Sequence, residues 1–164
     1  MTPRPIDADN HYYEPDDCFT RHIEPAFRDR AVRVVRGEGP YARVYLGEKR
    51  SEFFSVPPGE VTGPPGSLRD FLHEKGESDG SHMTHNAICG VKVPEYTDRE
   101  ARLRLMDEQN VEAAVFLPSL GVGVEWELRH DPPALAANLR AFNRWFADDW
   151  DWAHRGRILS VAMI

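Results

Sequence analysis

Two short apolar runs, separated by a helical pattern, constrain the fold of this chain more than any other feature. The first run covers residues 112–117 and ends at Pro118, and the second covers residues 157–164 and begins after Gly156. Continuous apolar runs of this length are typical of strands that are covered on both faces in a parallel sheet. The pattern therefore predicts an α/β fold in which strands alternate with helices.

The segments that precede the two runs carry the end signals of helices. Residues 97–100, Thr-Asp-Arg-Glu, form a capping box, which predicts a helix from there to about Gln109. Asp131 followed by two prolines predicts the N-cap of another helix, because proline is tolerated in the first turn. The second helix should bury one face, since apolar residues recur along it at helical spacing: Leu135, Leu139, Phe142, Phe146 and Trp150.

The middle of the chain, from about Gly37 to Pro94, is rich in glycine and proline. Within it, residues 31–35 and 42–46 flank a Gly-Glu-Gly-Pro segment, which predicts two strands joined by a turn. The repeated Pro-Pro-Gly further on predicts an ordered loop without a regular element. We expect residues 16–96 to form an insertion after a first strand, within one domain that spans residues 1–164.

Strand, insertion, helix, strand, helix, strand is the order in which a TIM-like (β/α)8 barrel begins. A closed barrel of this kind needs eight strand–helix units and typically about 250 residues. The 164 residues of this chain hold two and a half units. The expected fold is therefore a partial (β/α)8 barrel with a partly β, Gly- and Pro-rich insertion after strand 1.

The composition excludes several classes of partner. A formal net charge of −7 argues against nucleic acid, which needs clustered Lys and Arg. No segment approaches the roughly 20 apolar residues that span a bilayer. The two cysteines, Cys18 and Cys89, lack the spacing of a disulfide framework or a zinc knuckle, which favours free thiols in a reducing cytoplasm. We expect a cytoplasmic protein that acts on a small-molecule substrate.

Candidate chemistry lies at the end of the first strand, where Asp9, Asn10 and His11 are followed by Glu14. Asp9 and His11 are two residues apart, so both should project from the same side of the strand. A carboxylate oxygen and a neutral imidazole nitrogen are suitable ligands for Zn²⁺, Mn²⁺ or Fe²⁺. Three roles fit Glu14: a third ligand, a partner of His11, or a catalytic carrier of protons.

Three stretches of the sequence resemble one family. The opening Ile-Asp-Ala-Asp-Asn-His-Tyr-Tyr-Glu-Pro, residues 99–125 and residues 142–164 are similar to the amidohydrolase-related branch of the amidohydrolase superfamily. This branch includes decarboxylases that resemble aminocarboxymuconate semialdehyde decarboxylase. The family fold is a distorted (β/α)8 barrel with a long insertion after the first strand, which agrees with the reading of residues 16–96 above.

The resemblance implies a metal-dependent hydrolase or a non-oxidative decarboxylase acting on a small organic substrate. The first-strand motif of the family supplies two ligands of one divalent ion, and these match Asp9 and His11. Glu14 also matches a recurrent position of the family. The family has further ligands, a His on a middle strand and an Asp near the last strand, for which these 164 residues have no counterpart. We therefore expect incomplete ligation of the ion and an isolated chain that is inactive.

The loop after the second predicted strand contains Ser119, which we predict to contact substrate because loops after strands line the active face of βα barrels. Gly121-Val122-Gly123 follows and lacks the third glycine of a dinucleotide fingerprint, so we expect a turn that opens onto no helix. The alternative function is a non-catalytic fragment, or half of a barrel that needs a partner chain. In that case the exposed apolar faces predict a homo-oligomer or a complementing carboxy-terminal chain.

Overall fold

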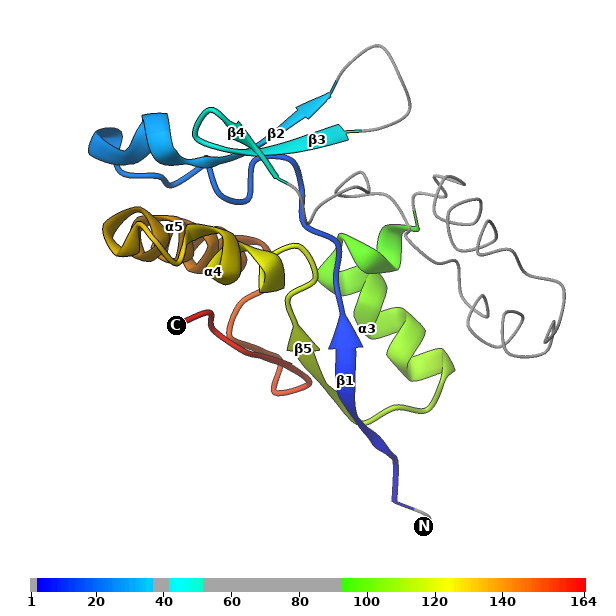
Figure 1. The fold of residues 1–164 in the computed structure, drawn as a ribbon. Helices are drawn as coiled ribbons and strands as arrows, with labels where there is room; N and C mark the ends of the chain where they lie inside the picture. The colour runs from blue at the N-terminus through cyan, green and yellow to red at the C-terminus, as the bar shows by residue number, and fades with distance from the viewer. Residues whose placement is uncertain (1–2, 37–41, 52–92) are drawn as a thin grey trace, which may run out of the picture.

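The structure is a computed structural model that describes residues 3–36, 42–51 and 93–164 (Figure 1). It is a mixed α/β fold built from strands, α-helices and two 3₁₀ helices, named η1 and η2. In chain order these elements are β1 (Ile6–His11), η1 (Pro25–Arg30), β2 (Val32–Arg36), β3 (Ala42–Leu46), β4 (Lys49–Arg50), η2 (Pro94–Tyr96), α3 (Arg99–Glu108), β5 (Ala113–Leu117), α4 (Val122–Leu128), α5 (Pro132–Asp149), β6 (Ala153–His154) and β7 (Ile158–Ser160).

The main sheet has the strand order β1-β5-β7-β6. Strands β1, β5 and β7 are parallel, whereas β6 is antiparallel to β7 and forms a short hairpin with it. The expected parallel sheet with helical connections is thus confirmed. The last predicted strand is shorter than expected, because only Ile158–Ser160 of residues 157–164 pair as β7. The two and a half units of a (β/α)8 barrel stay a prediction, since within the described residues the main sheet is open.

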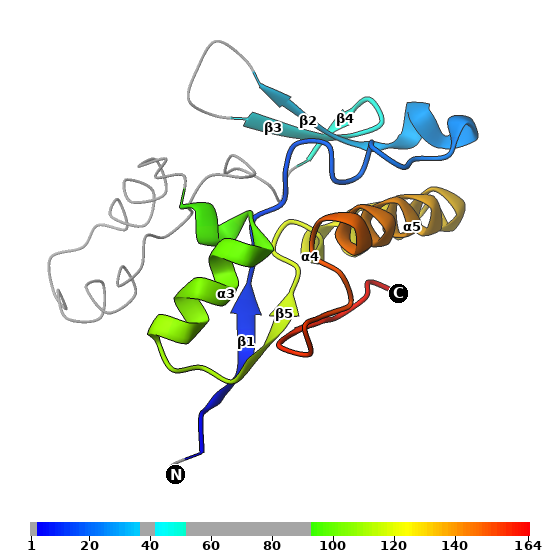
Figure 2. The ribbon, with the colours of Figure 1, turned by 180° about the vertical axis from the view of Figure 1, so that it is seen from behind.

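One side of the main sheet faces the helices and forms the core. Phe116 of β5 and Ile158 of β7 are fully buried there, and Tyr12 packs between Phe116 and the aromatic residues of α5. In Figure 2, which views the molecule from behind, α5 lies in front of α4. The predicted apolar face of α5 is confirmed, because Leu139, Phe142, Phe146 and Trp150 are buried and Leu135 is partly buried. Burying each large aromatic side chain contributes about 2–3 kcal/mol.

The other side of the main sheet carries apolar side chains that remain exposed. Ile6 is 63 % exposed, Leu159 37 % and Val161 43 %. Strand pairing places Ile6 and Leu159 on one side, since Ile6 lies beside Ala113 and Leu159 beside Val115, and Val161 follows Leu159 by two residues, just after the end of β7. We call this side, defined by Ile6, Leu159 and Val161, the open face of the main sheet. No helix of the described residues covers it.

A second, antiparallel sheet of order β2-β3-β4 is formed by part of the predicted insertion. The two predicted strands are confirmed as β2 and β3, and β4 was not predicted. Gly47, in the turn between β3 and β4, has a φ of 61°, and a Cβ there would lie 2.9 Å from the carbonyl oxygen of Asp29. Residues 37–41 and 52–92, which include the predicted turn and most of the predicted loop, lie outside the described residues.

Asn138 of α5 joins the second sheet to the helical layer. Its side chain is fully buried, and its Oδ1 accepts a hydrogen bond of 2.8 Å from the backbone N–H of Val32. Its Nδ2 donates to the carbonyl oxygens of Arg30, at 3.1 Å, and Ala134, at 2.8 Å. A buried amide that satisfies three backbone groups holds the strand to the helix, because each of these groups would be costly to leave unpaired.

Two helix starts test the predicted N-caps. Asp131 is the N-cap of α5, as predicted, and accepts a hydrogen bond of 3.2 Å from the N–H of Ala134. The helix α3 begins one residue later than the capping box indicated. Its N-cap is Asp98, whose Oδ1 accepts from the N–H of Ala101 at 2.6 Å, while the Thr97 hydroxyl points to the carbonyl oxygen of Pro94. The carboxylate of Asp98 is a stronger hydrogen-bond acceptor than the hydroxyl of Thr97, which explains why Asp98 is the N-cap.

The expectation that Gly121-Val122-Gly123 opens onto no helix was wrong. Helix α4 begins at Val122 with Gly121 as its N-cap. A Cβ at Gly121 would collide with the sulfur of Met163 and lie 3.1 Å from Cβ of Pro118, so the side chain of Met163 packs where a larger residue at position 121 would stand. Glycine has a low propensity for helix, and the tertiary contacts of α4 outweigh this cost.

We predict that Asn138→Ala lowers the free energy of unfolding by about 2–4 kcal/mol, because it leaves buried backbone groups of Arg30 and Val32 unpaired. Urea denaturation of the variant and the parent chain measures this. Arg144→Ala, at an exposed position of the same helix, is the control and should change the free energy by less than about 0.5 kcal/mol. Equal losses in the two variants would contradict the role given to Asn138.

Candidate metal site at the end of strand β1

The end of β1 contains a β-bulge. Asp7 pairs with Ala114 and Asn10 pairs with Phe116, so three residue steps in β1 lie opposite two in β5. One extra residue in a strand changes the side to which the following side chains point. In a regular strand Asp7, Asp9 and His11 would share one side, whereas the bulge separates Asp7 from the other two.

Hydrogen bonds confirm this separation. The Nδ2 of Asn10 donates to Oδ2 of Asp7 at 2.6 Å, and the N–H of Asp9 donates to Oδ1 of Asp7 at 3.1 Å. The side chains of Asp9 and His11 are 81 % and 50 % exposed, and Oδ1 of Asp9 lies 3.4 Å from Nε2 of His11. The prediction that Asp9 and His11 meet on one side of the strand is thus confirmed.

The other ring nitrogen of His11 faces Ser119. The Ser119 hydroxyl donates to the carbonyl oxygen of Tyr12 at 3.1 Å, and its oxygen lies 3.3 Å from Nδ1 of His11. When the serine hydroxyl donates to Tyr12, its oxygen is left to accept a hydrogen bond, and we assign the ring hydrogen of His11 to Nδ1 on this basis. In the neutral ring this leaves a lone pair on Nε2, which points toward Asp9.

An imidazole lone pair and a carboxylate oxygen that face each other require a positive charge between them, supplied by a proton or by a metal ion. Two ligands that each lie about 2.1 Å from one ion at a tetrahedral angle are themselves about 3.4 Å apart. The separation of Oδ1 of Asp9 and Nε2 of His11 equals this value. The hydrogen bond from Nδ1 to Ser119 is also the kind that orients histidine ligands.

Two potential ligands come together at this point in the described part of the chain. Within residues 3–36, 42–51 and 93–164, no group of three or more His, Cys, Asp or Glu side chains is arranged to hold an ion. The chemistry of Asp9 and His11 fits a divalent cation, but their number falls short of the three or four protein ligands of a complete site.

Glu14 lies behind the pair, with 2 % of its surface exposed. Its Oε1 accepts hydrogen bonds from the N–H groups of Ser119, at 2.8 Å, Leu120, at 2.7 Å, and Gly121, at 3.4 Å. Burial raises the pKa of Glu14 to about 7, and the three N–H groups oppose this rise. The carboxyl group therefore fixes the loop after β5, and its link to His11 runs through Ser119. Its predicted catalytic role remains a prediction.

Ser119 is brought to the site as predicted for a residue of the loop after β5, where its hydroxyl contacts His11 and the backbone of Tyr12. Contact with substrate remains a prediction. Sequence reasoning missed Arg102 of α3, which is buried and donates to the carbonyl oxygen of His11 at 2.9 Å. The sequence carries no signal for it, because an arginine within a charged helix looks like a surface residue.

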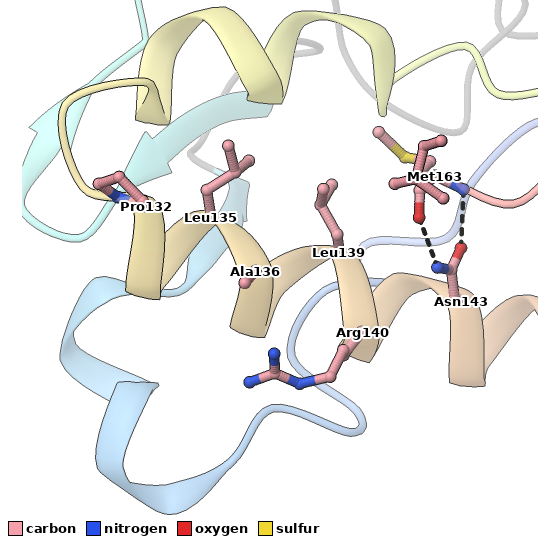
Figure 3. Close-up of a pocket in the computed structure, with 8 residues that line it drawn as sticks. Pro132, Leu135, Ala136, Leu139, Arg140, Asn143 and Met163 are labelled. Carbon is pink, nitrogen blue, oxygen red and sulfur yellow. Dashed lines mark hydrogen bonds between the residues drawn. The ribbon is translucent and has the colours of Figure 1, made fainter.

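An apolar groove of about 310 Å³ lies elsewhere, along α5 beside the C-terminal segment. Leu135, Leu139 and Met163 line it, and the side-chain amide of Asn143 pairs with the backbone of Met163 at 2.7 and 3.0 Å (Figure 3). None of the residues that line the groove belongs to the Asp9–His11 pair. The groove has no acid, base or ligand of its own beyond Arg140, so it is no candidate for the catalytic centre.

No protein-family model and no curated protein matches the sequence. Among solved structures, the crystal structure of an amidohydrolase from Mycobacterium avium subsp. paratuberculosis matches the whole chain at 34 % sequence identity and a TM-score of 0.79. The chain is similar to an amidohydrolase. It spans 43 % of the length of that protein.

The likeness supports the coarse expectations drawn from the three sequence stretches, namely an amidohydrolase-related chain with a partial barrel of parallel strands. Separately, no described helix has the length and apolar character needed to cross a membrane.

The raised pKa of Glu14 predicts how stability depends on pH. The acid binds its proton more tightly in the folded chain, with a pKa of about 7, than at its ordinary value of 4.5. The contribution of Glu14 to the stability of the folded chain is therefore complete below about pH 4.5 and is lost as the pH rises through about 7. Within this range the unfolding equilibrium constant should increase by up to about tenfold per pH unit. Urea denaturation across this range measures it.

Glu14→Gln is the matched variant, because the amide keeps an oxygen that can accept from the three N–H groups and removes the titration. We expect the stability of the variant to vary less steeply with pH than that of the parent chain. Parallel pH profiles would show that Glu14 is not the group responsible.

Proposed function

We propose that this chain contributes to the catalytic centre of a metal-dependent enzyme of the amidohydrolase superfamily that acts on a small organic substrate. Asp9 and His11 hold one divalent ion, Zn²⁺, Mn²⁺ or Fe²⁺. The observation that carries the proposal is the 3.4 Å between Oδ1 of Asp9 and Nε2 of His11, together with the contact of the other ring nitrogen, Nδ1, with the Ser119 hydroxyl. The 34 % identity to an amidohydrolase supports it independently.

A divalent ion at this point supplies Lewis-acid polarisation, either for hydrolysis of a C–N or C–O bond or for loss of carbon dioxide from a carboxylated substrate. The residues of the chain would bind and orient the ion. His11 and Asp9 bind, Ser119 orients the His11 ring, and Glu14 holds the loop that carries Ser119. The resemblance of the three sequence stretches covers both reactions, so hydrolysis and decarboxylation stand side by side in this proposal.

The number of ligands limits what the described residues do alone. Metal affinity depends on ligand count and on fixed geometry. With two ligands in place, we propose that the isolated chain binds the ion weakly and does not turn over substrate, and that complete activity needs ligands from outside the described part.

This proposal predicts that Mn²⁺ broadens the NMR signals of β1 and of the loop around Ser119, because a paramagnetic ion acts on nuclei near it. His11→Ala and Asp9→Asn should each weaken the apparent affinity at least about tenfold. His130→Ala, at an exposed position, is the control and should leave the titration unchanged. If Mn²⁺ still broadened these signals in His11→Ala, the result would contradict the proposed metal site.

The open face of the main sheet favours a second candidate function. Ile6, Leu159 and Val161 are exposed there, and within the described residues β1 has no strand on its outer side. Exposed apolar faces and unpaired strand edges promote association. We propose as the alternative that the chain is a non-catalytic half-barrel whose open face is covered by a second copy of the same chain.

The alternative predicts concentration-dependent association in light scattering, with a mass approaching twice that of the single chain. Leu159→Lys should shift the equilibrium toward the monomer at least about tenfold, because it places a charge on the contact face. Val122→Lys, an exposed position of α4, is the matched control. A monomer at high concentration would count against the alternative.

A further inference from the structure

Arg102 is a buried cation, with 4 % of its surface exposed. Its guanidinium donates to the carbonyl oxygens of Glu95, at 2.5 Å, and His11, at 2.9 Å, and to Oδ1 of Asn10. No carboxylate of the described residues forms an ion pair with it. Instead it stacks on the rings of Tyr96 and Phe116, with centroid distances of 5.2 and 5.1 Å.

A buried cation is costly to desolvate, and three oxygen acceptors together with the nearby carboxylates of Asp7 and Glu95 offset this cost for Arg102. Burial also lowers the pKa of Arg102, the direction expected for a desolvated cation. Two of the three acceptors, the His11 carbonyl and the Asn10 amide, belong to the bulged end of β1. The planar fork of an arginine can bind both at once.

These contacts brace the bulge from the helix side. Asn10 connects Arg102 to Asp7, since its Oδ1 accepts from the guanidinium and its Nδ2 donates to Asp7 at 2.6 Å. The chain from Arg102 through Asn10 to Asp7 occupies one side of the strand, and Asp9 and His11 occupy the other. The direction in which His11 points therefore depends on the bulge being held.

We infer that Arg102 is the positioning residue of the candidate metal site, because its contacts to Asn10 and to the His11 backbone hold the bulge that turns Asp9 and His11 toward one ion. This inference deepens the proposed function and rests on it for the identity of the ligand. The plain alternative is a structural role, in which Arg102 ties α3 to β1 without influence on the ligand pair.

Arg157 provides a matched control. It also donates to backbone carbonyls, those of Val111 at 2.8 Å and Glu112 at 2.9 Å, but these precede β5, at the opposite end of the strand. Arg102→Lys and Arg157→Lys both keep the charge and lose the fork. Both should lower the free energy of unfolding, so stability alone does not distinguish the two roles.

Two measurements on the full chain do distinguish them. The first is the Mn²⁺ titration, in which Arg102→Lys should weaken the apparent affinity about 10–100-fold, the usual effect of losing a group that orients a ligand, whereas Arg157→Lys should not. The second is the nitrogen NMR spectrum of His11 without metal. There the Nδ1–H form should predominate in the parent chain and in Arg157→Lys, and should lose population in Arg102→Lys.

Each outcome has a meaning. Equal weakening in both lysine variants, or none in Arg102→Lys, overturns the positioning role. If the parent chain shows no Mn²⁺ binding that depends on His11, the proposed function fails, and the NMR spectrum alone decides whether Arg102 sets the geometry of His11. If Arg102→Lys does not fold, Asn10→Ala removes only the link between Arg102 and Asp7 and should alter both readouts in the same direction.

Discussion

The bulge in β1 is the constraint on which the candidate site depends. A strand of regular register would place Asp7, Asp9 and His11 on one side and leave Asn10 alone on the other. Because of the extra residue, the side chains of Asp7 and Asn10 lie on the side of the strand that faces the helices, and those of Asp9 and His11 lie on the other side. A local irregularity in backbone pairing thus divides a run of polar residues into a supporting set and a ligand set.

Support for the ligand pair comes from two separate parts of the chain. From the helix side, α3 contributes the guanidinium of Arg102, which reaches the backbone of His11. The loop after β5 contributes Ser119, whose hydroxyl contacts Nδ1 of the His11 ring. The backbone N–H of Ser119 in turn donates a hydrogen bond to the buried carboxyl group of Glu14. Backbone and ring of the same histidine are held by different elements, as is usual where a ligand must keep one orientation.

Much of this arrangement was predictable from the sequence, and the remainder was not for identifiable reasons. Apolar runs located β5 and β7, and alternation along the first strand placed Asp9 beside His11. The bulge was not predictable, because it depends on the register against β5 and not on β1 alone. Helix α4 was missed because its glycines suggest a turn, and the close approach of Met163 to Gly121 appears only in the folded chain.

Glu14 binds its loop in a way that lets the stability of the chain and the geometry of the loop respond differently to acidity. All three backbone donors converge on one oxygen, Oε1. A carboxylic acid carries its proton on one oxygen and keeps the other as an acceptor, so a proton on Oε2 leaves the three bonds intact. The loop, and with it the hydroxyl that faces His11, can keep its conformation in either protonation state. Acidity can thus alter how firmly the chain is folded while the ligand geometry stays the same.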